Sequence, residues 1–458
     1  MATATKQEFL FKSDLKTNDF EHKRKISFNI TKYNKAVAKG KQQFANLEAA
    51  RKIAKNRKWD AIENLDEKLL EFERNFTAKG GKVIWAETSE EANQAILEIC
   101  KKQNCKTVVK SKSMVTEEIG LNPFLEEHAI ESIETDLGEY IQQLDNEAPY
   151  HIVTPAMHKS KEDIAKLFYD KLNAEANLSP EELTQIARKN LREKYTQAEV
   201  GITGGNFLVA DVGGVCLTEN EGNARLSTAF PPVHIAVVGI EKMIASINDL
   251  NLLWPLLSTY GTGQTQTVYN SILTGPKQIN EVDGPEEMYV ILLDNGRTKL
   301  IDDPQLRESA YCIRCGSCLN VCPIYKNIGG HTYGTTYSGP IGSVISPHLE
   351  NYEEYNHLSH ASSLCGSCTD ACPVKINIHG MLHYNRTLAI TNKTADTNEK
   401  RAWRAWQLGM KKRGLLDVTS AGMKNILIKK LFGAPWGAHR SDLKFGKTFK
   451  QLYKESKK

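Results

Sequence analysis

The chain has 458 residues, of which 40% are hydrophobic and 25% are charged, and its formal net charge is +4. That length exceeds one ordinary hydrophobic core and the apolar content excludes a disordered chain, so we expect two or three globular domains. No apolar stretch approaches the roughly 18 residues that a membrane-spanning helix needs, and the chain opens without a secretory pattern. We therefore expect no membrane span and a cytoplasmic protein. The small net charge argues against a dedicated nucleic-acid binder, and we expect no nucleic-acid partner.

Residues 1–79 predict a helical N-terminal extension. They are rich in Lys, Glu, Asn and Ala, and their apolar residues recur at helical spacing, as in Ile62, Leu65 and Leu69. Such spacing places apolar side chains on one face of a helix.

Residues 80–300 alternate short apolar runs with helix-like segments. The expected strands are residues 82–86, 107–110, 150–153, 199–202, 207–210, 233–238 and 288–293. Strands that alternate with helices indicate an α/β domain built on a parallel sheet. Strand-like runs end before Arg297, and Asp302-Asp-Pro304 predicts a short linker to the next domain.

Seven of the ten cysteines fall between Cys312 and Cys372. In a reducing compartment such a group indicates metal or iron–sulfur ligation in preference to disulfides. The run Cys312-x2-Cys315-x2-Cys318-x3-Cys322-Pro323 recurs 50 residues later, with Ser362 in the first position and Cys365, Cys368 and Cys372 in the others. This internal repeat predicts a separate iron–sulfur domain over residues 301–395.

The spacing of the two runs also suggests which cysteines share a cluster. In bacterial two-cluster proteins the last cysteine of each run ligates the other cluster. This rule gives one [4Fe–4S] cluster on Cys312, Cys315, Cys318 and Cys372, and a second cluster on Cys322, Cys365 and Cys368. The hydroxyl of Ser362 is a poor ligand because the thiolate is the species that binds metal. The second cluster is thus [3Fe–4S], or [4Fe–4S] with a non-cysteine fourth ligand or an open iron. Structural zinc is the alternative, and the paired spacing favours clusters.

A second candidate site lies between Gly201 and Arg225, where glycines and polar side chains gather at the expected strand ends. Open α/β sheets bind ligands there. We interpret the segment as a cofactor or anion site formed by Asn206, Asp211, Glu219, Asn223 and Arg225. The alternative is that the glycines only make tight connections between strands. A dinucleotide fingerprint and a P-loop are both lacking, and no catalytic residue is identified.

Several motifs together resemble the lactate utilization protein B family, over about residues 60–395. They are Thr135-Asp-Leu-Gly-Glu139, Pro149-Tyr-His-Ile-Val-Thr-Pro-Ala-Met-His158, Glu199-Val-Gly-Ile-Thr-Gly-Gly-Asn206, Glu219-Asn-Glu-Gly-Asn223, Leu293-Asp-Asn-Gly-Arg297, the Cys312–Pro323 run, Gly329-Gly-His331, Gly339-Pro-Ile-Gly342 and Cys372-Pro-Val-Lys-Ile376. The resemblance implies a LUD domain, with a CoA-transferase-like α/β fold, followed by an α-helical ferredoxin-type iron–sulfur module. It also implies electron transfer in a cytosolic system that oxidises L-lactate to pyruvate, with lactate utilization proteins A and C as partners.

These observations favour an electron relay over a hydride-transferring enzyme. An iron–sulfur cluster exchanges single electrons and carries no hydride, and two such centres suit the two electrons that lactate releases. We expect a component of an oxidoreductase complex of the L-lactate dehydrogenase type, acting with a redox partner protein. One alternative is electron transfer for another 2-hydroxy acid or a disulfide oxidoreductase. Another is a LUD enzyme that binds CoA or phosphate esters and has regulatory clusters.

Residues 396–458 form a basic C-terminal extension. Within it, residues 401–458 hold 15 Lys and Arg against 3 Asp and Glu. A solvated helical face is the simpler interpretation, and docking onto an acidic partner is the alternative.

Overall fold

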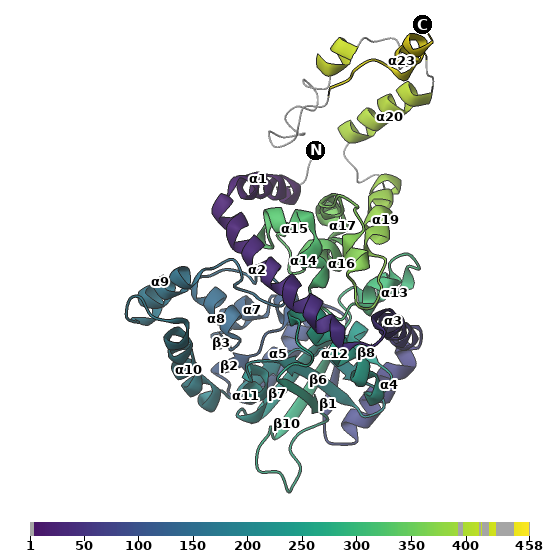
Figure 1. The fold of residues 1–458 in the computed structure, drawn as a ribbon. Helices are drawn as coiled ribbons and strands as arrows, with labels where there is room; N and C mark the ends of the chain where they lie inside the picture. Colours follow the sequence, from purple (N-terminus) through teal and green to yellow (C-terminus); the bar gives the residue numbers. More distant parts are fainter. Residues whose placement is uncertain (1–3, 393–396, 412–413, 415–420, 427–443, 458) are drawn as a thin grey trace. The chain divides into compact units, whose positions relative to one another are not determined.

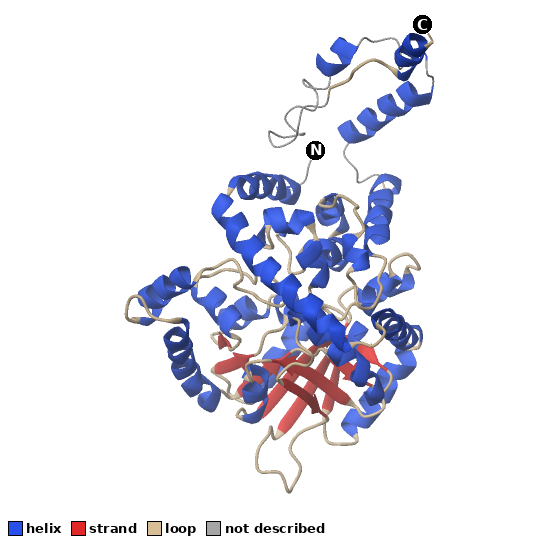
Figure 2. Ribbon diagram, in the orientation of Figure 1, coloured by secondary structure: helices blue, strands red, loops and turns tan. Residues whose placement is uncertain are grey.

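The computed structural model describes residues 4–392, 397–411, 414, 421–426 and 444–457. The described chain up to Ala389 forms one compact unit, and Ile390 begins a second one. Figure 1 labels the elements, and Figure 2 shows the strands gathered in one part of the first unit with helices around them. None of the helices in the described ranges is both long and apolar enough to cross a membrane.

A six-stranded parallel sheet forms the centre of the α/β part. Its order is β1 (Lys82–Ala86), β10 (Glu287–Leu293), β7 (Val233–Gly239), β4 (Val200–Thr203), β2 (Thr107–Lys110) and β3 (Glu131–Glu134), and every neighbouring pair runs parallel. All of β7 is buried. Its residues Val233, Ile235 and Val237 belong to one hydrophobic core, whereas Ala236 and Val238 belong to another. A strand that is covered on both faces requires such an uninterrupted apolar run.

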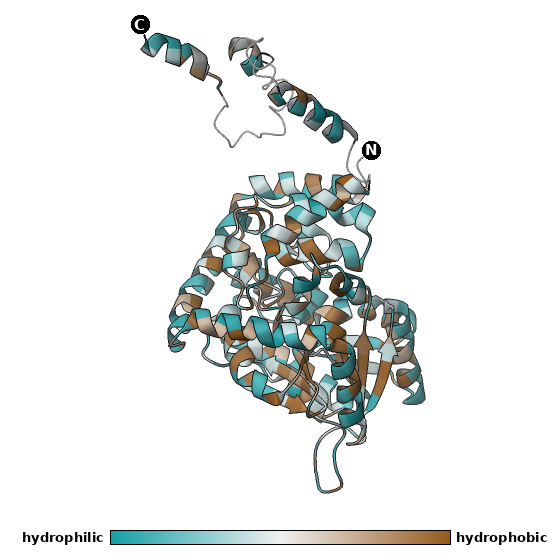
Figure 3. Cartoon of the chain, turned by 90° about the vertical axis from the view of Figure 1, so that its right-hand side faces the viewer, coloured by the Kyte–Doolittle hydropathy of each residue, from teal (hydrophilic) through white to brown (hydrophobic). Residues whose placement is uncertain are grey.

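Different elements pack against the two faces of this sheet. One core includes residues of α5 (Ser89–Lys102), α6 (Met114–Glu118) and α7 (Leu121–Glu127), and the other includes residues of α4 (Leu65–Thr77) and of a second sheet. A separate cluster joins α8 (Leu137–Leu144), α9 (Lys161–Leu172) and α10 (Pro180–Gln197) to Val109 of β2. Figure 3 shows the strands mostly brown, and the helices that surround them display much of their teal, hydrophilic surface. The amphipathic helices therefore bury the sheet.

The second sheet has four strands of mixed direction. Its order is β8 (Met243–Ile244), β5 (Phe207–Val209), β6 (Gly214–Glu219) and β9 (Tyr269–Leu273). The strand expected at 207–210 therefore forms, but it lies outside the parallel sheet. Around the second sheet lie α11 (Asn223–Ala229), α12 (Leu250–Thr262) and the 3-10 turns η2 (Ile240–Lys242) and η3 (Ile247–Asp249).

The expected strand at residues 150–153 is wrong, because this segment is an irregular loop. The His151 ring nitrogen Nδ1 accepts hydrogen bonds from the backbone N–H groups of Val153 and Thr154, at 3.1 and 3.3 Å. The Tyr325 hydroxyl donates to the Tyr150 carbonyl at 2.9 Å. The apolar run is buried against the cysteine module, which comprises residues 297–391, and does not join a sheet. A buried loop and a buried strand are both apolar, so apolar content alone does not distinguish them.

The N-terminal residues are helical, as expected. They form α1 (Ala4–Asn18), α2 (Phe20–Gly40), the turn η1 (Lys41–Gln43), α3 (Leu47–Glu63) and α4. Helix α2 begins at Asp19, whose carboxylate accepts from the backbone N–H of His22 at 2.9 Å. Helix α3 contacts β8 and the cysteine module, so the N-terminal helices join the two larger parts.

Short helices make up the cysteine module. They are α13 (Arg297–Asp302), η4 (Arg307–Tyr311), α14 (Ser317–Val321), α15 (Pro323–Ile328), η5 (His331–Tyr333), α16 (Gly339–Leu349), α17 (Tyr352–Tyr355), η6 (Asn356–His360), α18 (Ser367–Asp370) and α19 (Ile378–Thr391). In the second unit, the described residues form α20 (Thr397–Lys411) and α23 (Phe449–Ser456), and other parts of the basic extension lie outside the described residues.

Candidate iron–sulfur centre and the adjoining cavity

The two cysteine runs share a backbone conformation as well as a sequence. Arg314 and Leu364 have φ angles of 58° and 53°, and Gly316 and Gly366 have φ angles of 72° and 81°. In each run a short helix, α14 or α18, follows the second left-handed residue. Glycine adopts this conformation without steric cost, which explains its place in both runs. The 50-residue repeat is therefore a repeat of structure.

The runs differ after their final cysteines. Cys322 caps α15, with Pro323 in the first helical position, and its sulfur accepts the backbone N–H of Tyr325 at 3.5 Å. No helix begins at the residue after Cys372. Instead, the Arg51 guanidinium of α3 donates to the Cys372 carbonyl at 2.8 Å and to the Asp370 carbonyl at 2.7 Å. A side chain distant in sequence thus positions the second run.

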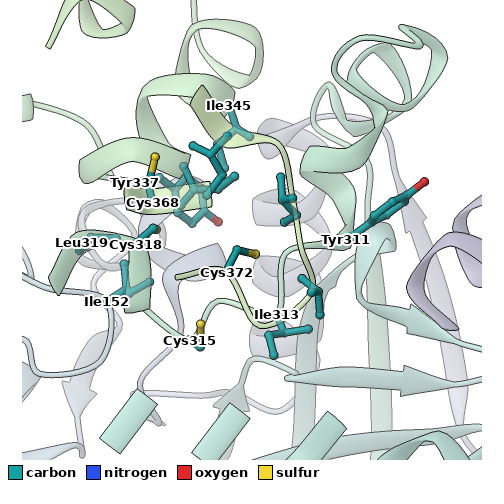
Figure 4. Close-up of a cluster of buried hydrophobic side chains, with 14 of the residues drawn as sticks. Ile152, Tyr311, Ile313, Cys315, Cys318, Leu319, Tyr337, Ile345, Cys368 and Cys372 are labelled. Carbon is teal, nitrogen blue, oxygen red and sulfur yellow. The ribbon is translucent and has the colours of Figure 1, made fainter. Parts of the chain in front are cut away.

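Four thiols act on one another across the two runs. Burial, with a smaller contribution from the Cys312 thiolate, raises the pKa of Cys372 to about 12. Burial raises the pKa of Cys315 as well, with further contributions from Cys372 and Cys312. The pKa of Cys318 is raised by burial, then by Cys312 and Cys315. Figure 4 shows Cys315, Cys318 and Cys372 in the same buried region. The four cysteines that the spacing predicts for one cluster are thus linked by their mutual electrostatic effects on pKa.

The other three cysteines form a second group. Burial and then the neighbouring Cys322 raise the pKa of Cys368 to about 11, and Cys365 adds to the shift. Burial also raises the pKa of Cys322, again with a contribution from Cys365. Cys365 itself is exposed, and hydrogen bonding between its sulfur and Ser367 lowers its pKa. The second group therefore contains one fully exposed cysteine, whereas the first contains three buried cysteines and the half-buried Cys312.

Ser362 takes part in a local turn. Its hydroxyl oxygen accepts the backbone N–H of Leu364 at 3.1 Å, and its carbonyl accepts the Arg386 guanidinium at 2.8 Å. The serine thus has a conformational role at the position where the first run carries Cys312.

The chemistry of these donors fits iron–sulfur clusters. Burial disfavours bare thiolates, so a bound cation must supply the compensating positive charge. Tetrahedral zinc would require sulfurs about 3.8 Å apart, from a Zn–S bond of about 2.3 Å. Among the described residues, the one set of three metal-ligating side chains with ligand atoms within 4.8 Å of one another is Glu147, His158 and His331, which contains no cysteine. In the described residues, no three cysteine sulfurs are drawn together as closely as a tetrahedral zinc site requires.

Buried cations surround the first group of cysteines. The Lys58 ammonium, 1% exposed, donates to the carbonyls of Glu241 and Met243 at 2.7 and 2.9 Å. Burial lowers the pKa of Lys242 to about 8, whereas Glu241 and the Cys312 thiolate raise it. Arg314 lies 4.3 Å from the ring centre of Tyr337. These cations offset part of the negative charge that several thiolates bring into the interior.

A buried ion-pair network links the α/β part to the cysteine module. Arg297 donates to Glu118 at 2.8 and 2.9 Å and to Glu241 at 2.7 Å, and all three side chains are at most 4% exposed. The Tyr337 hydroxyl of the module donates to Glu118 at 2.6 Å. Arg314, which precedes Cys315, lies 3.5 Å from the other oxygen of Glu241. The cysteine runs are therefore attached directly to the ends of the α/β strands.

A cavity of about 400 Å³ lies at this junction. Its lining includes Cys315 of the first cysteine group, together with Asn206, Glu219 and Asn223 of the α/β part. Asn206 accepts the backbone N–H of Thr218 at 2.8 Å through its side-chain oxygen. The carboxylate of Glu219 accepts the backbone N–H groups of Ala224 and Arg225 at 2.7 and 2.9 Å. Three of the five residues proposed for a ligand site thus border one cavity that touches a cysteine run.

The remaining two lie elsewhere. The carboxylate of Asp211 accepts the backbone N–H of Ile247 at 3.0 and 3.2 Å, outside this cavity. Arg225 lies 6.0 Å from the ring centre of Tyr269 and lines a different hollow.

Two cationic residues of the cavity, Lys242 and Arg314, were missed in the sequence. Lys242 follows the carboxyl end of β7, where parallel sheets bind ligands, so this rule would have drawn attention to it. Arg314 lies between two predicted ligands, at a left-handed position that side chains rarely occupy.

Comparison with known proteins agrees with this architecture. The LUD domain model matches residues 69–293, and the 4Fe-4S dicluster domain model matches residues 308–376. The chain is 45% identical over 383 residues to lactate utilization protein B of Bacillus cytotoxicus, which is 83% of this chain and 80% of that protein. It is 44% identical, with the same coverage, to the protein of that name in Bacillus thuringiensis. A crystal structure of a DUF162 family protein from Deinococcus radiodurans aligns with 50% of this chain and with 98% of its own chain. The sequence identity is 13% and the TM-score is 0.29, which is too weak a likeness for a conclusion. The chain belongs to the lactate utilization protein B family, and it joins a LUD domain to a 4Fe-4S dicluster domain.

Proposed function

We propose that this chain relays single electrons through two iron–sulfur clusters during the oxidation of L-lactate to pyruvate. Its relatives are named for lactate utilization. A bound iron–sulfur cluster accepts and releases one electron at a time. The observation that carries the proposal is the division of seven cysteines, drawn from two repeated turns, into two groups of interacting thiols.

The two groups suggest the ligands of each cluster. We assign Cys312, Cys315, Cys318 and Cys372 to a [4Fe–4S] cluster, and Cys322, Cys365 and Cys368 to a second cluster. The crossing of Cys322 and Cys372 between the runs is supported by the effect of each on thiols of the opposite run. Because the Ser362 hydroxyl is a poor ligand, the second cluster is [3Fe–4S] or has a fourth ligand other than cysteine.

Burial suggests a direction for the electrons. Cys315 is 7% exposed and borders the cavity, whereas Cys365 is exposed. Cys368 of the second group also raises the pKa of Cys318 in the first, so the two groups are neighbours. Electrons would enter at the buried group and leave at the exposed one, toward a redox partner protein in the cytoplasm. The hydride step belongs to a partner, for which lactate utilization proteins A and C are the candidates.

The test is whether L-lactate reduces the bound clusters. The anaerobically purified chain is mixed with lactate utilization proteins A and C, and cluster absorbance is followed after L-lactate is added. We expect bleaching in the unsubstituted chain and in C216S, a buried cysteine outside the runs, and a loss of bleaching in C372S. If dithionite bleaches the clusters and L-lactate does not, the proposal is wrong. Equal bleaching by glycolate would favour a broader 2-hydroxy acid relay.

A further inference from the structure

The cavity at the junction of the LUD domain and the cysteine module is lined by two cationic groups, Lys242 and Arg314, with unused hydrogen-bond donors. Lys242 is 6% exposed and lines the cavity, and among the described residues its ammonium group has no hydrogen-bond or ion-pair acceptor. The Nη1 atom of Arg314 is buried without a hydrogen-bond partner. A buried donor without an acceptor costs about 1–3 kcal/mol, and more when it is charged. Both groups would gain an acceptor if an anion occupied the cavity.

The charges of the lining indicate which kind of anion fits. Three cationic side chains, Lys112, Lys242 and Arg314, face the cavity together with three carboxyl groups, Asp136, Glu219 and Glu221. The balance of formal charges disfavours an ion with several negative charges. The strongest electrostatic neighbours of Glu221 are Asp136 and Lys112, whereas those of Lys242 are Arg314 and Glu241. Asp136 and Glu221 thus act mainly on each other and on Lys112, whereas Lys242 acts mainly with Arg314 and Glu241.

The charged side chains of the cavity also differ in their hydrogen-bond partners. The Lys112 ammonium donates to the Val153 carbonyl at 3.0 Å. Glu219 and Glu221 accept backbone N–H groups at the starts of α11 and α8, the latter at 3.1 Å from Leu137. Lys242 and Arg314 therefore remain as the groups that lack a full set of acceptors. A singly charged acid group in the cavity would supply the missing acceptors.

We propose that this cavity binds a small organic monocarboxylate, with its carboxylate held by Lys242 and Arg314 beside Cys315. The inference deepens the proposed function and rests on it for the choice of lactate and pyruvate as probes. The volume of about 400 Å³ lies within the range of ligand pockets and exceeds the size of a three-carbon acid. The side chains of Asn206 and Asn223 border the space available to the rest of the ligand.

Isothermal titration calorimetry on the anaerobic, cluster-loaded chain tests this binding directly. The probes are L-lactate, pyruvate, inorganic phosphate and L-lactamide, which has the shape of lactate without its charge. We expect binding of at least one carboxylate and none of L-lactamide. K242M should weaken the binding about tenfold or more, because a hydrogen bond to a charged group is lost. Methionine suits a buried position, so this variant is expected to fold.

R51Q is the matched control. It removes a positive charge that acts on Cys372 and does not line the cavity. We expect it to change the reduction potential of the first cluster and to leave carboxylate binding within about twofold of the unsubstituted chain. If K242M and R51Q both shift the potential and neither weakens binding, the cations only offset cluster charge and the inference is wrong. Binding of phosphate or L-lactamide in place of the carboxylates would also overturn it.

The inference and the proposed function fail separately. If no carboxylate binds to this chain alone, while L-lactate still bleaches its clusters in the presence of proteins A and C, the cavity proposal fails and the relay stands. If a carboxylate binds in a K242-dependent manner but L-lactate never bleaches the clusters, the site stands and the relay in lactate oxidation fails.

Discussion

Replacement of Arg297 by methionine should cost more unfolding free energy than the loss of an ordinary surface ion pair, because Arg297 belongs to a buried network. Arg297 bridges Glu118 and Glu241 with three contacts of 2.7 to 2.9 Å, and all three side chains are at most 4% exposed. Loss of one partner from a buried ion pair typically costs 3–5 kcal/mol. Glu118 would retain hydrogen bonds from Asn295 at 2.7 Å and from Tyr337. We therefore expect R297M to lose about 3 kcal/mol of unfolding free energy.

The pH dependence of this loss follows from Glu118. Burial alone would raise its pKa, but Arg297 more than offsets burial and holds the pKa below its ordinary value. In the unsubstituted chain Glu118 therefore contributes stability above about pH 4.5, which is lost as the pH falls through its folded pKa. Without Arg297, burial should raise the folded pKa, so the protonated carboxyl fits the interior at low pH. The difference between the two proteins should be large at pH 8 and smaller at pH 5.

Urea unfolding followed by circular dichroism, at equal cluster content, measures the effect. R307M is the control. Arg307 and Glu63 form an ion pair with an N–O distance of 3.0 Å, and their side chains are 33% and 30% exposed. Loss of such a pair should cost about 1 kcal/mol of unfolding free energy. Equal losses in R297M and R307M, or a loss in R297M that does not change between pH 5 and pH 8, would refute the reasoning.

Three other predictions test separate parts of the structure. Burial lowers the pKa of His22 from 6.5 to about 4, so the stability that its neutral form provides should fall by about 2–3 kcal/mol as the pH drops from 6.5 to 4, and H22Q should flatten this part of the unfolding curve. G330A would bring a methyl group to 1.8 Å from the Tyr150 carbonyl oxygen and should lower the unfolding free energy by about 2–4 kcal/mol, as measured by thermal unfolding. G334A places its methyl group in open space on a left-handed backbone and should cost only about 1–2 kcal/mol. The reverse order of the two losses would contradict the packing. C372S should lose about half of the bound iron and C216S none, as measured by iron quantitation; equal iron in both variants would exclude Cys372 as a ligand.

The parallel sheet could be predicted from the sequence where its strands are short apolar runs, which includes the partly exposed edge strand β1. β1, β2, β4, β7 and β10 are short apolar runs, and each forms at or within one residue of the expected range. β3 was missed because Glu131-Ser-Ile-Glu134 is mostly polar and lies at the sheet edge. A strand of mostly polar residues lacks the apolar run on which such predictions depend.

The family and the iron–sulfur domain were also predicted and are confirmed by the comparisons. The repeat with its spacing of 50 residues carries that information locally, within the two runs. The ligand sets and the domain boundaries stay predictions. The cavity could not be predicted, because Lys242, Arg314 and Asn206 come from three distant segments that only the folded chain brings together. Contacts of this kind leave no pattern in any single segment.

The central claim is that the seven cysteines hold two iron–sulfur clusters. Iron, acid-labile sulfide and zinc are quantified in the anaerobically purified chain, and electron paramagnetic resonance is recorded at low temperature before and after reduction. We predict about seven or eight iron atoms per chain, matching sulfide, and signals from two neighbouring one-electron centres. Stoichiometric zinc with negligible sulfide would contradict the account.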